Sequence, residues 1–201
     1  MRCDDRSGIN PVRRWLCALG VILVRRFLSA LLCLVGLAVL SGGARAEDRA
    51  QPDLFSLGAG KFDVDDNQPR NQAADFRLEY RFGAALLEAG DWLTVRPWVG
   101  AEVTSDGGVY GGGGLVLDIP IGPLNLTPSF GAGLHYDGNG KQLGSALEFR
   151  SQAELSYRFE NDSRLGIAYG HISNGGITEA NPGSEILTVY WHFPSSWLFG
   201  N

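Results

Sequence analysis

Apolar and polar residues alternate along several segments of this chain with a period of two. In the segment D-F-R-L-E-Y-R-F, which ends at Phe82, the even positions are apolar, whereas Arg77, Glu79 and Arg81 occupy odd positions. A β-strand places alternate side chains on opposite faces of a sheet, so this pattern predicts a strand with one apolar and one charged face. An amphipathic helix would instead need apolar residues three and four positions apart.

The same alternation continues through most of the chain after residue 50. It runs over seventeen residues between 143 and 159, which is longer than a strand of a soluble sandwich usually is. Clusters rich in Gly, Pro, Asn and Asp interrupt it seven times and are typical of turns. The pattern therefore predicts eight strands, at roughly 52–64, 73–86, 92–104, 109–119, 124–136, 144–159, 163–173 and 184–193.

Eight amphipathic strands of about ten or more residues predict an all-β fold, an eight-stranded antiparallel transmembrane β-barrel of the outer-membrane type. Closure removes the edges of the sheet, and lipid covers the apolar outer face. The charged residues then point inward, and we expect them to pair there as a structural core, with a functional role as the alternative. A soluble lipocalin-like barrel, with the apolar face inside, is the other fold that this pattern allows.

The first 46 residues have the features of a signal peptide. Arg25 and Arg26 precede a run of fourteen apolar residues from 27 to 40, and an A-x-A cleavage site ends at Ala46. Fourteen residues span roughly 21 Å as a helix, less than the hydrocarbon core of a membrane. We expect export and a mature barrel domain at 47–201. Residues 1–20 make the leader unusually long, and a true translation start near residue 21 or 24 would explain them.

Charge and cysteine content narrow the classes of function. Residues 47–201 contain 10 Lys and Arg against 20 Asp and Glu, so the mature domain is too acidic for a nucleic-acid binder. All three cysteines, Cys3, Cys17 and Cys33, lie in the leader. The mature domain therefore has no disulfide, cysteine nucleophile or thiolate metal site, and we expect neither a metal nor another cofactor.

Three polar residues interrupt the apolar outer face of the last two strands. His171 and Ser173 continue the outward positions of the strand 163–173, and Glu185 lies on the outward face of the next strand. Ionisable groups that face lipid are costly and indicate function. Ser173 fits a nucleophile, His171 its general base and Glu185 the group that orients the imidazole. The alternative is a polar rim where the strands leave the membrane.

The residues around this trio resemble the PagL family of outer-membrane lipid A 3-O-deacylases. The stretch G-H-I-S-N-G-G at 170–176 has the His-x-Ser-Asn pattern of that family, and Glu185 follows Ser173 by twelve positions. The resemblance implies that Ser173, His171 and Glu185 are catalytic, that Asn181 and the Gly176 N–H form the oxyanion hole, and that Asn174 gives local support. It also points to a homodimer.

The expected function is hydrolysis of the 3-O-linked acyl chain of lipid A in the bacterial outer membrane. With both termini periplasmic, the loop 174–183 is extracellular, so the substrate partner is lipopolysaccharide, among outer-membrane lipids. Two alternatives stay open: a non-enzymatic small barrel for adhesion or envelope integrity, and a lipid A acyltransferase. The chain departs from many such barrels at its end, because residues 194–201 follow the last aromatic residue of the strand pattern.

Overall fold

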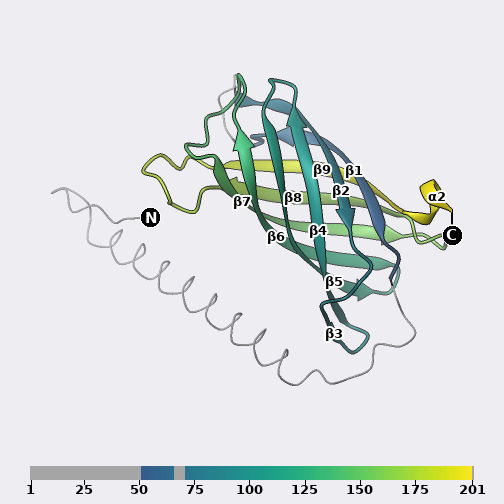
Figure 1. Ribbon diagram of the computed structural model, residues 1–201. Coiled ribbons are helices and arrows are strands. Elements are labelled where there is room, and N and C mark those ends of the chain that lie inside the picture. The colour runs from purple at the N-terminus through teal and green to yellow at the C-terminus, as the bar shows by residue number, and fades with distance from the viewer. Residues whose placement is uncertain (1–50, 66–70, 201) are drawn as a thin grey trace. The chain divides into compact units, whose positions relative to one another are not determined.

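The structure, a computed structural model, describes residues 51–65 and 71–200, which build a sheet that closes into a barrel (Figure 1). Its elements are β1 (Leu54–Phe62), β2 (Ala73–Arg81), β3 (Leu87–Ala89), β4 (Leu93–Thr104), β5 (Val109–Ile121), β6 (Leu124–Tyr136), β7 (Leu147–Arg158), β8 (Arg164–Ser173), β9 (Ser184–Pro194) and the short helix α2 (Ser196–Phe199).

Eight of these strands form the wall of the barrel. Neighbours are antiparallel in the order β2-β1-β9-β8-β7-β6-β5-β4, and the pairing of β2 with β4 closes the ring. The three residues of β3 only extend the pairing of β4. The predicted eight-stranded antiparallel barrel is confirmed, and its closure leaves no wall strand with an unpaired edge.

The two faces of each strand differ in polarity as the sequence pattern predicts. On β2, Phe76 and Leu78 are each 52% exposed on the outside, whereas Arg77 and Glu79 are buried inside. The other strands repeat this arrangement, with exposed apolar side chains such as Ile167 on β8. A soluble lipocalin-like barrel would bury the apolar face, so this alternative is wrong.

Ion pairs fill the interior. Arg81 Nη2 lies 2.7 Å from Glu154 Oε2, and His192 Nε2 lies 2.9 Å from Glu154 Oε1. Arg77 Nη2 lies 3.0 Å from Glu102 Oε2. Further buried pairs join Glu79 to Arg150, and Asp118 to Arg96 and Arg164. The inward charges named here pair as expected, which compensates their burial in a narrow barrel. Arg158, also expected to point inward, instead lies half exposed beside Asp162.

Five predicted strands extend further than the observed ones, by one to five residues, and the first two show the reason most clearly. The first ends at Phe62 because Asp63 adopts a φ of 61°, a left-handed conformation that an extended strand cannot contain. The second ends at Arg81, since the backbone then turns so that the Gly83 N–H donates to Asp53 Oδ1 at 2.5 Å. The residues after this turn form β3, which the alternation of the sequence does not predict.

The ends of the described barrel lie together. The Ser195 N–H donates to the carbonyl of Asp53 at 2.8 Å, and the loop 174–183 lies at the opposite end of the barrel (Figure 1). The signal peptide expected at 1–46 lies outside the described residues. Among the residues that are described, no helix is long and apolar enough to cross a membrane.

Candidate active site

The polar residues predicted to be functional lie on the outer face of β8 and β9. Ile167 and Tyr169 are exposed apolar positions on β8, and the next outward positions are His171 and Ser173, both half-buried. Glu185, also half-buried, is the outward residue nearest the start of β9. All three therefore lie at the end of the barrel that is remote from the termini, next to the loop 174–183.

The pairing of β8 with β9 brings His171 directly opposite Glu185. His171 Nδ1 lies 3.0 Å from Glu185 Oε1, and the two side chains are 44% and 32% exposed. A protonated Nδ1 donates to the carboxylate, which holds the imidazole in one orientation. Nε2 is then the ring nitrogen that can accept a proton from a nucleophile.

Ser173 is the next outward residue after His171 on the same strand. Two residues of a strand span about 6.6 Å, so the serine lies beside the histidine on the side of the loop. On β7, Ser173 is opposite Phe149 and His171 is opposite Ser151. The structure thus joins His171 to Glu185 by a hydrogen bond and places Ser173 on the same outer face.

The backbone at Gly183 closely approaches the imidazole. A Cβ atom at this position would lie 2.7 Å from His171 Cε1 and 3.2 Å from Nε2, and the φ of Gly183 is 63°. Only glycine fits both the left-handed backbone and the short distance. Sequence reasoning did not assign this residue a role, and the Asn-Pro-Gly turn that contains it was the available signal.

Asn174 organises the loop after β8. This residue is fully buried, and its Nδ2 donates to the carbonyls of Ala180 and Leu143 at 2.9 and 3.1 Å. Its backbone N–H donates to Asn181 Oδ1 at 3.0 Å, and its Oδ1 accepts the Gly176 N–H at 2.9 Å. These bonds tie the loop to itself and to the connection between β6 and β7.

Asn181 and Gly176, the residues expected to form an oxyanion hole, thus both contact Asn174. The Gly176 N–H is donated to a side chain within the loop. Asn181 uses its Oδ1 in this network, and its Nδ2 is the group with which it could donate to a substrate oxygen. The oxyanion-hole assignment therefore stays a prediction.

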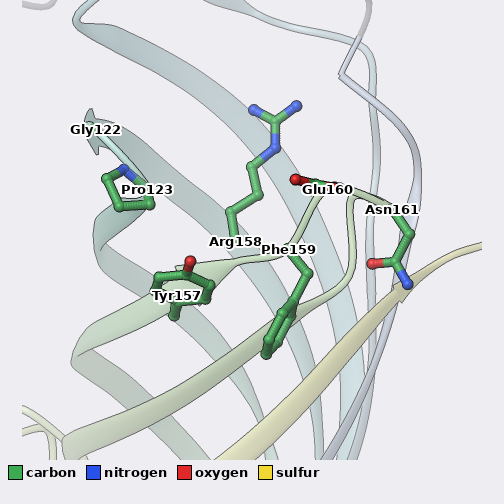
Figure 2. A pocket seen from close by; sticks show the side chains of 7 residues that line it. All are labelled: Gly122, Pro123, Tyr157, Arg158, Phe159, Glu160 and Asn161. Carbon is green, nitrogen blue, oxygen red and sulfur yellow. The ribbon is translucent and has the colours of Figure 1, made fainter.

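Other places in the structure offer less chemistry. Within residues 51–65 and 71–200, no group of three or more His, Cys, Asp or Glu side chains could hold a metal ion. A hollow lies between the β5–β6 and β7–β8 turns, at the end of the barrel opposite the loop 174–183. Figure 2 shows its seven lining residues, and the Arg158 guanidinium points away from the rings of Tyr157 and Phe159. Arg158 Nη2 lies 2.5 Å from Asp162 Oδ1, and no predicted site residue lines the hollow.

A comparison with protein families gives the assignment. The profile of the family described as lipid A 3-O-deacylase (PagL) matches residues 60–194, from β1 to the end of β9, and includes all six predicted site residues. The chain belongs to the PagL family. This assignment confirms the resemblance found in the motif around Ser173.

Two PagL proteins are similar to this chain. A protein of Bordetella bronchiseptica named lipid A deacylase PagL is 36% identical over 53 residues, which are 26% of this chain and 30% of the relative. The match thus spans less than a third of the relative's length. The crystal structure of the outer membrane enzyme PagL has a TM-score of 0.54 and 18% identity, over 70% of this chain and 99% of that one. This similarity shows the shared fold. The family of the chain and the apolar exterior of its barrel together place the protein in the bacterial outer membrane.

Proposed function

We propose that this protein is an esterase that hydrolyses the 3-O-linked acyl chain of lipid A, with Ser173, His171 and Glu185 as its catalytic residues. One observation carries the proposal: His171 Nδ1 lies 3.0 Å from Glu185 Oε1 on the lipid-facing side, with Ser173 as the next outward residue. A carboxylate hydrogen-bonded to an imidazole beside a serine is costly on a lipid-facing surface, which favours a catalytic role over a polar rim. Membership of the PagL family supports the choice of substrate.

The reaction would proceed in two steps through an acyl-enzyme. His171 Nε2 takes the proton of Ser173 Oγ as this oxygen attacks the ester carbonyl carbon, and the bond to the sugar oxygen breaks as that oxygen receives the proton from His171. Water then attacks the acyl-serine with the same base, which releases a fatty acid and restores Ser173. Throughout, Glu185 holds the ring and stabilises the imidazolium.

Asn181 and Gly176 are our proposed donors to the oxyanion, through Asn181 Nδ2 and the Gly176 N–H. A preorganised donor contributes strongly at such a position. The Gly176 N–H must exchange Asn174 Oδ1 for the substrate oxygen, so Asn174 would both support the loop and compete with the substrate. The mechanism uses no metal and no cofactor.

The substrate partner is lipopolysaccharide, approached from within the membrane. With the termini on the periplasmic side, the loop 174–183 and the catalytic residues lie at the depth of the outer leaflet, where lipid A resides. A homodimer, expected from the family resemblance, stays part of this proposal.

Mass spectrometry of lipid A from cells that express the protein tests the reaction. We expect lipid A to lose one acyl chain, and Ser173→Ala to abolish this loss while the barrel keeps its heat-modifiable migration in gels. A triad serine typically contributes several powers of ten to the rate. Ser196→Ala, in α2 at the opposite end, is the matched control and should keep full activity.

The alternatives give other results. Unchanged lipid A would support a non-enzymatic barrel, and lipid A that gains an acyl chain would support an acyltransferase. A Ser173→Ala protein that no longer folds would assign the serine a structural role.

A further inference from the structure

The first residues of the β1–β2 turn, 63–65, bind the beginning of β9 through two hydrogen bonds. The Val64 N–H donates to the carbonyl of Glu185 at 3.0 Å, one residue out of the β1–β9 register, which ends at Phe62. The buried Ser184 Oγ donates to Asp63 Oδ1 at 2.9 Å. Glu185 and the residue before it are therefore both bonded to the turn.

Asp63 connects a third part of the barrel to this point. Its side chain is fully buried, and its Oδ1 also accepts a hydrogen bond from Lys141 Nζ at 2.5 Å. Lys141 belongs to the connection between β6 and β7. A buried carboxylate needs such compensation, so the contact with Lys141 holds the Asp63 side chain in place.

The same turn also contacts β8 on the outer face. Tyr169, two residues before His171, donates a hydrogen bond from its Oη to Asp65 Oδ2 at 2.5 Å. The turn thus contacts both strands that carry the proposed catalytic residues, β8 through Asp65 and β9 through Asp63. Its position indicates a role in their alignment.

We propose that Asp63 is a positioning residue that acts through Glu185; this inference rests on the proposed function. The bonds from Ser184 and Val64 fix the start of β9, where a strand would otherwise fray. Glu185 Oε1 thereby stays within hydrogen-bond distance of His171 Nδ1. A displacement of about 1 Å in such an arrangement can lower a rate by about a hundredfold.

The unusual backbone of Asp63 permits a specific test. Asp63→Gly keeps the left-handed φ and removes the carboxylate, whereas Asp63→Asn keeps an acceptor for Ser184 and also tolerates this φ. With purified barrel and lipid A in detergent, we expect Asp63→Gly to lower kcat roughly ten- to a hundredfold with KM within about twofold. Asp63→Asn should recover most of kcat.

Asp162 supplies a matched control. It is the other described non-glycine residue with positive φ, at 62°, and it also accepts a hydrogen bond from a cationic side chain, Arg158. It lies in the β7–β8 turn at the opposite end of the barrel. Asp162→Gly should leave kcat and KM unchanged.

A double-mutant cycle separates positioning from general stability. If Asp63 acts through Glu185, then Asp63→Gly should change the residual kcat of Glu185→Gln by less than about twofold. An equal loss of kcat in both backgrounds, a loss confined to KM, or no rescue by Asp63→Asn would overturn the inference.

Failure of this inference is distinguishable from failure of the proposed function. An active Ser173→Ala protein would refute the proposed catalytic serine. An inactive Ser173→Ala protein together with a fully active Asp63→Gly protein would refute only the positioning role.

Discussion

Gly183 lies so close to His171, the candidate general base, that the methyl group of an alanine would not fit beside the imidazole. A Cβ atom there would lie 2.7 Å from His171 Cε1, at a φ of 63°. We expect Gly183→Ala to displace the imidazole and to lower kcat at least tenfold, because orientation of the base contributes strongly to such a reaction. Hydrolysis of detergent-dispersed lipid A by the purified barrel measures the change.

Gly122→Ala separates the clash from backbone strain. Gly122 has a φ of 61°, but a Cβ atom there would have no heavy atom within 4 Å. Strain alone costs about 1–2 kcal/mol and should leave the activity of this control intact. Equal activities of the two alanine variants would show that the contact with His171 does not matter.

Some residues of the candidate site were predictable and others were not. The outward direction of His171, Ser173 and Glu185 follows from the period of two, and their proximity follows from antiparallel pairing of neighbouring strands. The five hydrogen bonds around Asn174 and the approach of Gly183 depend on the path of an irregular loop, which has no period. Asp63 and its partner Lys141 are 78 positions apart, so no local pattern joins them.

Across the barrel, strands distant in sequence are connected through buried charges. Arg81 on β2 and Glu154 on β7 are 73 positions apart and form one of these pairs, and both side chains are almost fully buried. The loss of one partner from such a pair destabilises the barrel by more than the net contribution of the pair, because the remaining buried charge is then uncompensated.

We therefore expect Arg81→Met to lower the free energy of unfolding of the barrel by about 3–5 kcal/mol. Urea unfolding in detergent, followed by tryptophan fluorescence, measures this difference. Arg158→Met is the matched control, because Arg158 pairs with Asp162 while the side chains are 46% and 41% exposed. Its effect should stay below about 1 kcal/mol, and an equal effect of the two substitutions would contradict the importance of burial.

At the level of strands, alternation in the sequence locates the elements better than their ends. The predicted strand 124–136 coincides with β6, where turn residues follow directly on both sides. The predicted strand 73–86 exceeds β2 by five residues, because apolar residues continue past the bend at Gly83. The end of β1 depends on the left-handed Asp63, and aspartate in a sequence does not by itself specify that conformation.

In the whole molecule, the chain after β9 folds back onto the outer aromatic residues. The Trp197 ring stacks on Phe193 with centroids 6.1 Å apart, and the Phe199 ring lies 6.0 Å from that of Phe55. The residues beyond the last strand, a departure noted in the sequence, thus continue the aromatic girdle typical of outer-membrane barrels. The two ends of the barrel differ: one carries this girdle and the other carries the candidate active site.

Because the candidate catalytic residues face outward from a filled barrel, we expect a lipid substrate to reach them by lateral diffusion in two dimensions. The relevant concentration is then the mole fraction of lipid A in the surface that surrounds the protein. At constant bulk lipid A, added inert detergent should lower the initial rate in proportion to this mole fraction, a behaviour known as surface dilution. Mixed-micelle kinetics at several ratios of detergent to lipid A measure it. A rate that follows only the bulk concentration would mean that the substrate enters from water.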